Sequence, residues 1–162
     1  MSVAAALKLR TLEEAASFAA SAKERGRTIA LCNGVFDLLH VGHVRYLEGA
    51  RAAADLVLVA VNADASVRAL RGPGRPIVPA RERAELIAAL WCVDLVFVFE
   101  DEDVRAVLRA VRPTFHVKGS DYTPDTVPER DVAAEVGARV LITGDPKDHA
   151  ATELIARVRA GT

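Results

Sequence analysis

NGVFDLLHVGH, residues 33–43, places two histidines three positions apart, directly between a predicted strand and a predicted helix. Upstream, residues 28–32 form a short apolar run of strand type, and residues 44–54 carry apolar side chains at helical spacing. A helix that begins here offers free backbone N–H groups and the positive end of its dipole. Gly42 lets an anion approach the backbone without meeting a Cβ atom. We therefore expect this corner to bind phosphate groups.

The residue types at this corner suit stabilisation of charge on phosphate better than covalent catalysis. His40 and His43 can donate hydrogen bonds to phosphate oxygens, and no serine or cysteine nucleophile lies nearby. Two other interpretations stay open: a core histidine beside a helix-start histidine, or a zinc site that would need Asp37 as a third ligand. We assign no residue to a metal.

The alternation of apolar strand patterns with helical patterns predicts an α/β fold, with a five-stranded parallel sheet covered by helices on both faces. The strands are expected near residues 28–32, 56–61, 95–99, 114–118 and 139–142. A doubly wound, Rossmann-like order 3-2-1-4-5 would open a crevice between strands 1 and 4. The histidine pair follows strand 1 and Lys118 follows strand 4, so we expect both at this crevice.

Helix starts and ends can be placed from capping residues. Thr11 and Glu14 form a capping-box pattern before a leading helix that Gly26 can end. Later in the chain, Pro79 suits the first turn of a helix, Asp101 can cap the next, and Gly137 can end the one after.

The same stretch resembles the shared motif of the cytidylyltransferase-like nucleotidyltransferases, and the chain is most similar to the adenylyltransferase domain of bacterial heptose enzymes. The similarity runs from about residue 11 to the C-terminus and includes residues 61–66, 75–77, 83, 93–94 and 117–122. The leading helix favours the heptose type over glycerol-3-phosphate cytidylyltransferases, which usually begin almost directly with the first strand. The resemblance implies transfer of AMP from ATP to a heptose 1-phosphate, release of pyrophosphate, and Mg²⁺ on the triphosphate.

The motif positions, read together with the predicted fold, give a set of expected site residues. The catalytic residues would be His40, His43 and Lys118; the nucleotide would contact Asn33, Gly34, Phe36, Gly42, Asn62, Asp64 and Thr152; the sugar phosphate would contact Asp37, Arg75, Arg83, Gly119 and Asp121. For Asp64, capping of the next helix is an equal alternative. Arg75 and Arg71 lie in a glycine- and proline-rich loop that could close over substrate.

Several residues have a structural or an uncertain role in this interpretation. Trp91 ends an apolar helix, so we expect it to pack rather than stack on a base, and His116 within a strand is expected to be structural. Relatives carry Ser and Thr hydroxyls where this chain has Ala150 and Ala151, which leaves His149 and Lys147 as substitutes for phosphate contacts. The loss keeps open a second function, a nucleotide-binding module with weakened catalysis. Another alternative function is that of a glycerol-3-phosphate or related phosphoalcohol cytidylyltransferase.

Length and composition set the remaining limits. The 162 residues, 51% of them hydrophobic, suffice for one domain, with a leading helix in residues 1–27 and a catalytic core in 28–162. A net charge of −1 without a basic stripe argues against a nucleic-acid partner, and against a fragment of an aminoacyl-tRNA synthetase. Two cysteines, Cys32 and Cys92, predict reduced, buried thiols, and the absence of a long apolar run predicts a cytoplasmic protein without membrane contact. Small-molecule substrates are the expected partners, supplied by a separate sugar kinase, and a homodimer is compatible with the family.

Overall fold

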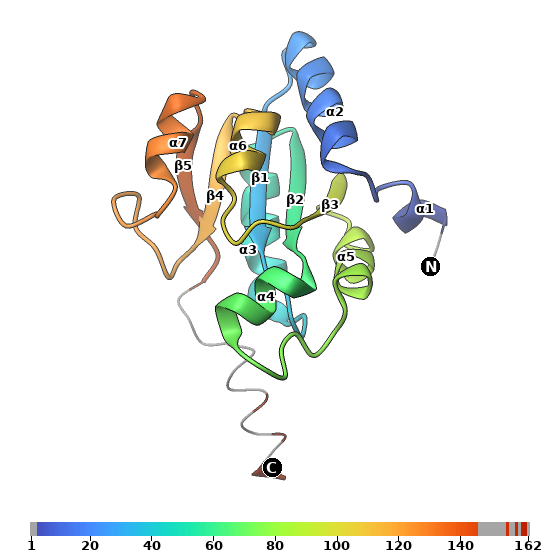
Figure 1. The fold of residues 1–162 in the computed structure, drawn as a ribbon. Coiled ribbons are helices and arrows are strands. Elements are labelled where there is room, and N and C mark those ends of the chain that lie inside the picture. The colour runs from blue at the N-terminus through green and yellow to red at the C-terminus, as the bar shows by residue number, and fades with distance from the viewer. Residues whose placement is uncertain (1–2, 146–154, 156–157, 159, 162) are drawn as a thin grey trace.

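The computed structural model describes residues 3–145, 155, 158 and 160–161 of the chain. Its centre is a five-stranded parallel sheet with the order β3-β2-β1-β4-β5 (Figure 1). The strands are β1 (Ile29–Gly34), β2 (Leu56–Asn62), β3 (Leu95–Phe99), β4 (Phe115–Gly119) and β5 (Arg139–Thr143). The predicted fold class and strand order are therefore confirmed, with strand ends that differ from the expectation by one or two residues.

Helices cover both faces of the sheet. They are α1 (Val3–Ala6), α2 (Leu12–Glu24), α3 (Val41–Ala53), α4 (Asp64–Arg71), α5 (Ala80–Ala88), α6 (Arg105–Val111) and α7 (Arg130–Glu135). Buried side chains of α3 and α5 share one core with one face of the sheet, and those of α2, α6 and α7 share the other. In Figure 1, α6 passes in front of the sheet and α3 lies behind it.

The two cores follow from the alternation of side chains along each strand. In β2, Val57, Val59 and Val61 point into the α3 and α5 core, whereas Leu58 and Ala60 point into the core with α2 and α6. Both sets are fully buried. This is why the strands read as continuous apolar runs instead of alternating with polar residues.

Most of the predicted helix ends are confirmed. The Thr11 hydroxyl accepts from the backbone N–H of Glu14 at 3.2 Å, and the Glu14 carboxylate accepts from the N–H of Thr11 at 2.8 Å. Gly26 and Gly137 follow helix ends with φ of +75° and +79°, a conformation that glycine adopts without strain. The described residues contain no helix that is both long and apolar enough to cross a membrane.

Two capping predictions were wrong in detail. Asp101 does not cap α6, because Val104 enters the core at the N-cap position and the helix begins only at Arg105. The carboxylate of Asp103 accepts from the Arg105 N–H at 3.0 Å instead. Pro79 precedes α5 as its N-cap residue and is not part of its first turn.

Candidate functional site

The connection from β1 to α3 is a tight turn at the carboxyl end of the sheet. Phe36 and Leu38 have positive φ angles of 52° and 59°, an uncommon conformation for residues other than glycine. A Cβ atom at Gly34 would come within 3.2 Å of the Phe36 ring, so a larger residue at this position would disturb the turn. Backbone geometry thus explains why Gly34 and Phe36 occur together in the motif.

The two motif histidines stack on each other at the start of α3. The ring centroids of His40 and His43 are 3.9 Å apart with an interplanar angle of 30°. The buried ring of Phe36 lies against the ring of His43, and the centroids of these two rings are 5.2 Å apart. Phe36 therefore supports the imidazole of His43, a role that differs from its predicted contact with the nucleotide.

The protonation state of His43 follows from its surroundings. Burial, with a smaller contribution from the charge of His40, lowers the pKa of His43 to about 4. The ring is then neutral at physiological pH. Its Nδ1 faces the backbone N–H of His40 at 3.4 Å and accepts from it, so the single ring proton is on Nε2. His43 presents a neutral N–H donor at a helix N-terminus, which suits an anionic oxygen.

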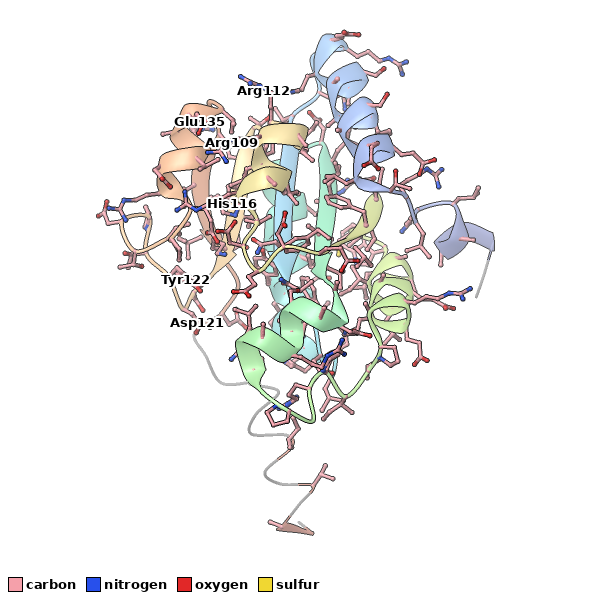
Figure 2. All side chains as sticks on the ribbon, viewed as in Figure 1. Arg109, Arg112, His116, Asp121, Tyr122 and Glu135 are labelled. Atoms are coloured by element: carbon pink, nitrogen blue, oxygen red, sulfur yellow. The ribbon has the colours of Figure 1, made fainter. Side chains whose placement is uncertain are left out.

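A second polar cluster gathers around Asn33 and the β4 strand. The Lys118 ammonium lies 3.5 Å from the side-chain oxygen of Asn33 and 5.0 Å from the ring centroid of Tyr122. The Nε2 atom of His116 lies 3.2 Å from the same Asn33 oxygen. Figure 2 labels His116 on β4 and Tyr122 beyond the end of that strand. Asn33 is the next-to-last residue of β1 and Lys118 the next-to-last residue of the neighbouring strand β4, as expected for the crevice between these strands.

Glu129 is the residue of this cluster that the sequence did not predict. Its carboxylate is buried and lies 3.5 Å from the Lys118 ammonium. The residue precedes α7 as its N-cap and is far from Lys118 in sequence. No motif identifies it, because only the packing of α7 against β5, the neighbour of β4 in the sheet, brings the two charges together. Removing a carboxylate and an ammonium from water costs free energy that their attraction only partly repays. Buried ion pairs of this kind are often found at functional sites, so we include Glu129 in the candidate site.

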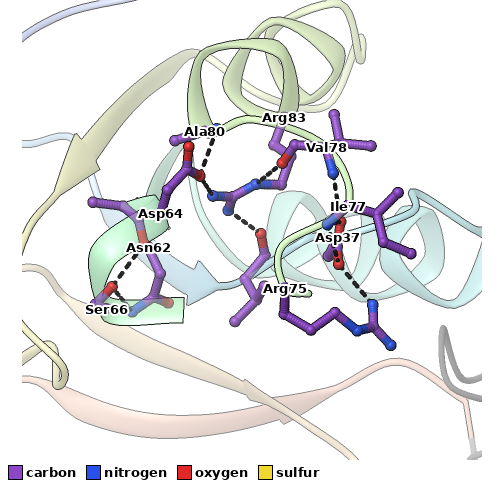
Figure 3. A network of polar contacts seen from close by, with 11 residues as sticks. Asp37, Asn62, Asp64, Ser66, Arg75, Ile77, Val78, Ala80 and Arg83 are labelled. Atoms are coloured by element: carbon purple, nitrogen blue, oxygen red, sulfur yellow. Dashed lines mark hydrogen bonds and ion pairs between the residues drawn. The ribbon is translucent and has the colours of Figure 1, made fainter. Parts of the chain in front are cut away.

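Asp37 holds the loop that follows α4. Its carboxylate accepts from the backbone N–H groups of Ile77 and Val78 at 3.0 Å and from the Arg75 guanidinium at 2.7 Å (Figure 3). Burial raises the pKa of Asp37, but the hydrogen bonds from Val78, Ile77 and Arg75 outweigh it and hold the pKa below its ordinary value. Asp37 is thus occupied by the protein itself, and Arg75 is the partner that keeps some exposure to solvent.

Arg83 is fully buried and its guanidinium is also committed to the protein. It donates to the backbone oxygens of Val78 and Val35 and to the carboxylate of Asp64, at 2.7 Å for the latter (Figure 3). Asp64 in turn accepts from the backbone N–H of Ala80 at 2.8 Å, at the start of α5. The expected contact of Arg83 with the sugar phosphate does not fit this burial. For Asp64, a capping role is seen, although the helix it caps is α5.

The remaining predicted residues are placed as follows. Asn62 is buried and donates to Ser66 at 3.4 Å near the start of α4, while Gly42 lies in the first turn of α3. Gly119 ends β4, and Asp121 follows it on the surface. Arg71 ends α4 and is exposed. Thr152, together with Lys147, His149, Ala150 and Ala151, lies outside the described residues.

Trp91 corrects one prediction. Its side chain is 71% exposed and donates from Nε1 to Glu48 at 3.3 Å, so it is not packed in the core. The apolar positions of the preceding helix that enter the core are Ala84, Ile87 and Ala88, and the chain turns after Leu90 in a direction that leaves the indole outside. Cys32 and Cys92, by contrast, are both buried and free, as predicted.

The described residues contain no group of three or more His, Cys, Asp or Glu side chains that could hold a metal ion. The zinc interpretation of His40, His43 and Asp37 therefore has no support, since Asp37 is bound to the loop. A hollow of about 720 Å³ lies elsewhere, between α2, α5 and the edge of β3, and neither motif histidine lines it.

Comparison with known proteins agrees with this geometry. A sequence model described as cytidylyltransferase-like matches residues 31–154, which include the histidine turn and the β4 cluster. The chain belongs to the cytidylyltransferase-like family. Curated relatives include the protein named bifunctional protein HldE from Syntrophotalea carbinolica, 41% identical over 93% of this chain, and that from Mesorhizobium japonicum, 43% identical over 91%. This chain covers 31% and 30% of those relatives, about a third of their length.

Two solved structures of other proteins share the fold of this chain. A lipopolysaccharide core biosynthesis protein from Thermoplasma volcanium matches with a TM-score of 0.63 and 24% identity, over 75% of this chain and all of that one. A pantoate-beta-alanine ligase from Francisella tularensis, solved with an ATP analogue and beta-alanine, matches with a TM-score of 0.62 and 13% identity. The latter match covers 90% of this chain and 69% of the ligase.

Proposed function

We propose that the protein is a nucleotidyltransferase that transfers AMP from ATP to a heptose 1-phosphate and releases pyrophosphate. The observation that carries the proposal is the histidine pair at the start of α3. A neutral His43 with its ring proton on Nε2, at a helix N-terminus, is suited to bind phosphate oxygens without forming a covalent bond. The Lys118 ammonium adds a positive charge from the neighbouring strand.

The chemistry requires little from the protein beyond positioning and charge. A phosphate oxygen of the sugar 1-phosphate would attack the α-phosphorus of ATP in line with the leaving pyrophosphate. Because a phosphomonoester has a second pKa of about 6, the nucleophile is ionised at neutral pH and needs no general base. In this mechanism His40 and His43 hold the bridging and leaving oxygens, and Lys118 stabilises the charge that develops on the phosphates.

The divalent cation implied by the family fits only as part of the nucleotide. The described residues offer it no ligand set of their own, and the nearest motif carboxylate, Asp37, is bound by the loop. Mg²⁺ commonly binds through substrate phosphates with few protein ligands, and there it would neutralise charge on the triphosphate. The protein residues would then act on the phosphate oxygens that remain free.

The loop after α4 is assigned to the acceptor side of the site. Arg75 is partly exposed and is paired with Asp37 next to the histidine turn. From this position its guanidinium would bind a sugar phosphate through two N–H groups at once. Gly119 and Asp121 follow Lys118 and would contact the sugar. Gly42, with Asn33 and Asn62, would line the nucleotide side, and Thr152 would contact the phosphates.

The heptose acceptor is supported by the curated relatives with the name HldE and by the leading helix, which the structure contains as α2. The relatives are about three times as long as this chain, so we propose that a sugar kinase activity on another domain or protein supplies the 1-phosphate.

The function can be tested by pyrophosphate release from the purified protein with Mg²⁺. ATP, CTP, GTP and UTP are each combined with D-glycero-D-manno-heptose 1-phosphate or glycerol 3-phosphate. We expect release with ATP and the heptose phosphate. Release with CTP and glycerol 3-phosphate would replace the proposal by a cytidylyltransferase of the related type, and nucleotide binding without release would indicate a module with weakened catalysis.

A further inference from the structure

His116 is a buried histidine that the mechanism does not use. Its side chain is fully buried on β4, on the sheet face opposite Phe115 and Val117, which both belong to the α3 core. It contacts Asn33, the next-to-last residue of β1, just before the phosphate-binding turn. The other ring nitrogen, Nδ1, is buried and has no hydrogen-bond partner among the described residues. Such an unmade hydrogen bond costs stability, so packing alone is a poor explanation for a histidine here.

The contacts of Asn33 decide which way its amide group points. The Lys118 ammonium can only donate hydrogen bonds, so the Asn33 atom that it approaches at 3.5 Å must be the oxygen. The same oxygen lies 3.2 Å from Nε2 of His116, which must therefore carry the ring proton. Burial, and then the charge of Lys118, lower the pKa of His116 to about 3, which leaves a neutral ring with one proton to place.

The amide nitrogen of Asn33 is left as a donor. With the oxygen held by two buried groups, the NH₂ group is turned away from both. No described residue accepts a hydrogen bond from it, and Asn33 itself is only half-buried, so it keeps access to the crevice. An anionic oxygen of a bound nucleotide is an acceptor of the kind that such an NH₂ group would meet.

We propose that His116 is a positioning residue: its Nε2–H holds the Asn33 side-chain oxygen, and thereby presents the Asn33 NH₂ group to the nucleotide as a hydrogen-bond donor. The inference deepens the proposed function, on which its ligand rests. It adds His116, expected from the sequence to be structural, to the residues that determine nucleotide affinity.

The side-chain arrangement can be measured without any ligand. Long-range ¹H–¹⁵N NMR of the labelled free protein at pH 7 distinguishes the two neutral forms of a histidine ring, and His116→Leu identifies the signal. We expect the proton on Nε2. A proton on Nδ1 would turn the amide of Asn33 around and overturn the inference, whatever the protein is found to bind.

Nucleotide affinity tests the consequence. Binding of ATP with Mg²⁺, without acceptor, is measured by calorimetry for the wild type, His116→Leu, His116→Gln, Asn33→Ala and the double variant Asn33→Ala/His116→Leu. We expect His116→Leu to weaken binding by about threefold to tenfold, the range for one hydrogen bond. His116→Gln, which supplies an N–H donor, should restore most of the affinity. In the Asn33→Ala background, His116→Leu should have no further effect, because the two residues act through one contact.

The controls separate the possible failures. Glu135→Gln changes an exposed residue of α7 and should bind ATP as the wild type does. Equal losses from His116→Leu in both backgrounds would mean a general packing effect and would overturn the inference, as would unchanged affinity. If the wild type binds no ATP while the Nε2 proton is found, the proposed function is contradicted and the side-chain arrangement is upheld.

Discussion

The histidine turn at the start of α3 and the loop network of Asp37, Arg75, Asp64 and Arg83 lie next to each other, and the sequence assigned both to substrate. The structure separates them. No described residue accepts a hydrogen bond from the Nε2–H of His43. The carboxylate of Asp37 and the guanidinium of Arg83, in contrast, are filled by backbone groups and by the side chains of Arg75 and Asp64, respectively. Residues that the sequence assigns to one site can therefore either remain available to bind a ligand or stabilise the fold.

The difference shows how a charged residue can be classified by its partners. A buried charge must be paired, and Arg83, which donates through Nε, Nη1 and Nη2, has little left to offer a ligand. The buried ammonium of Lys118 has only the longer contacts of 3.5 Å with Glu129 and Asn33. Arg75 lies between the two cases, because it is paired with Asp37 but retains exposed surface. The following predictions test this division, from the largest expected effect to the smallest.

Arg83→Met should reduce the free energy of unfolding by about 3–5 kcal/mol, because it removes a fully buried guanidinium and leaves the carbonyls of Val35 and Val78 and the carboxylate of Asp64 without their partner. Urea unfolding monitored by circular dichroism measures the change. Arg81→Met, on the exposed side of the same helix, is the control and should change stability by less than about 0.5 kcal/mol. Similar values for the two variants would mean that the loop network does not support the fold.

His43→Ala should lower kcat by about 10²- to 10³-fold, the usual loss for one preorganised donor to a transition-state oxygen. His43→Gln retains an N–H group and should lose less. Both are measured with saturating substrates, and thermal unfolding should show that both variants remain folded. Turnover of His43→Ala near that of the wild type would remove His43 from the mechanism.

Stability should fall as the pH is lowered below about 6.5. The pKa values of His43 and His116 in the folded state are about 4 and about 3, both below the ordinary value of 6.5 that holds in an unfolded chain. Between those values the unfolded chain binds protons that the folded state excludes, which costs up to about 1.4 kcal/mol per pH unit for each histidine. Urea unfolding at pH 7 and pH 5 checks this, and His116→Leu should show a shallower dependence. An equal slope in that variant would contradict the burial of a neutral His116.

Arg75→Ala should raise the KM for the sugar phosphate about tenfold with a smaller effect on kcat, if the exposed part of its guanidinium binds the acceptor. Arg71→Ala, on the exposed end of α4, is the matched control and should leave the KM close to the wild-type value. A purely structural Arg75 would instead appear as lower stability with unchanged KM in the folded fraction.

Trp91→Ser should change the free energy of unfolding by less than about 0.5 kcal/mol, because the side chain is 71% exposed. Tryptophan fluorescence of the wild type should show a solvent-exposed indole, since this is the chain's only tryptophan. A loss of several kcal/mol would restore the packing role that the sequence suggested.

The reliable sequence predictions came from patterns with a local physical cause. The capping box of Thr11 and Glu14, the helix stops at Gly26 and Gly137 and the five apolar runs each depend on neighbouring residues alone. The predictions that were wrong in detail concern positions that are decided by contacts between residues distant in sequence. Val104 entering the core delayed α6 past Asp101, and the direction of the chain after α5 left Trp91 outside.

The sequence by itself determined the segments of a parallel α/β fold and the position of the histidine turn, because apolar periodicity and the motif between strand and helix are local properties. The strand order was expected only by analogy with Rossmann-like sheets, and the structure confirmed it. The tertiary structure alone decided which polar residues are available to a ligand. The pairing of Glu129 with Lys118, of Arg83 with Asp64 and of His116 with Asn33 joins residues that are distant in sequence or on different strands. Availability depends on how many partners surround a polar group in space, and no local pattern encodes that number.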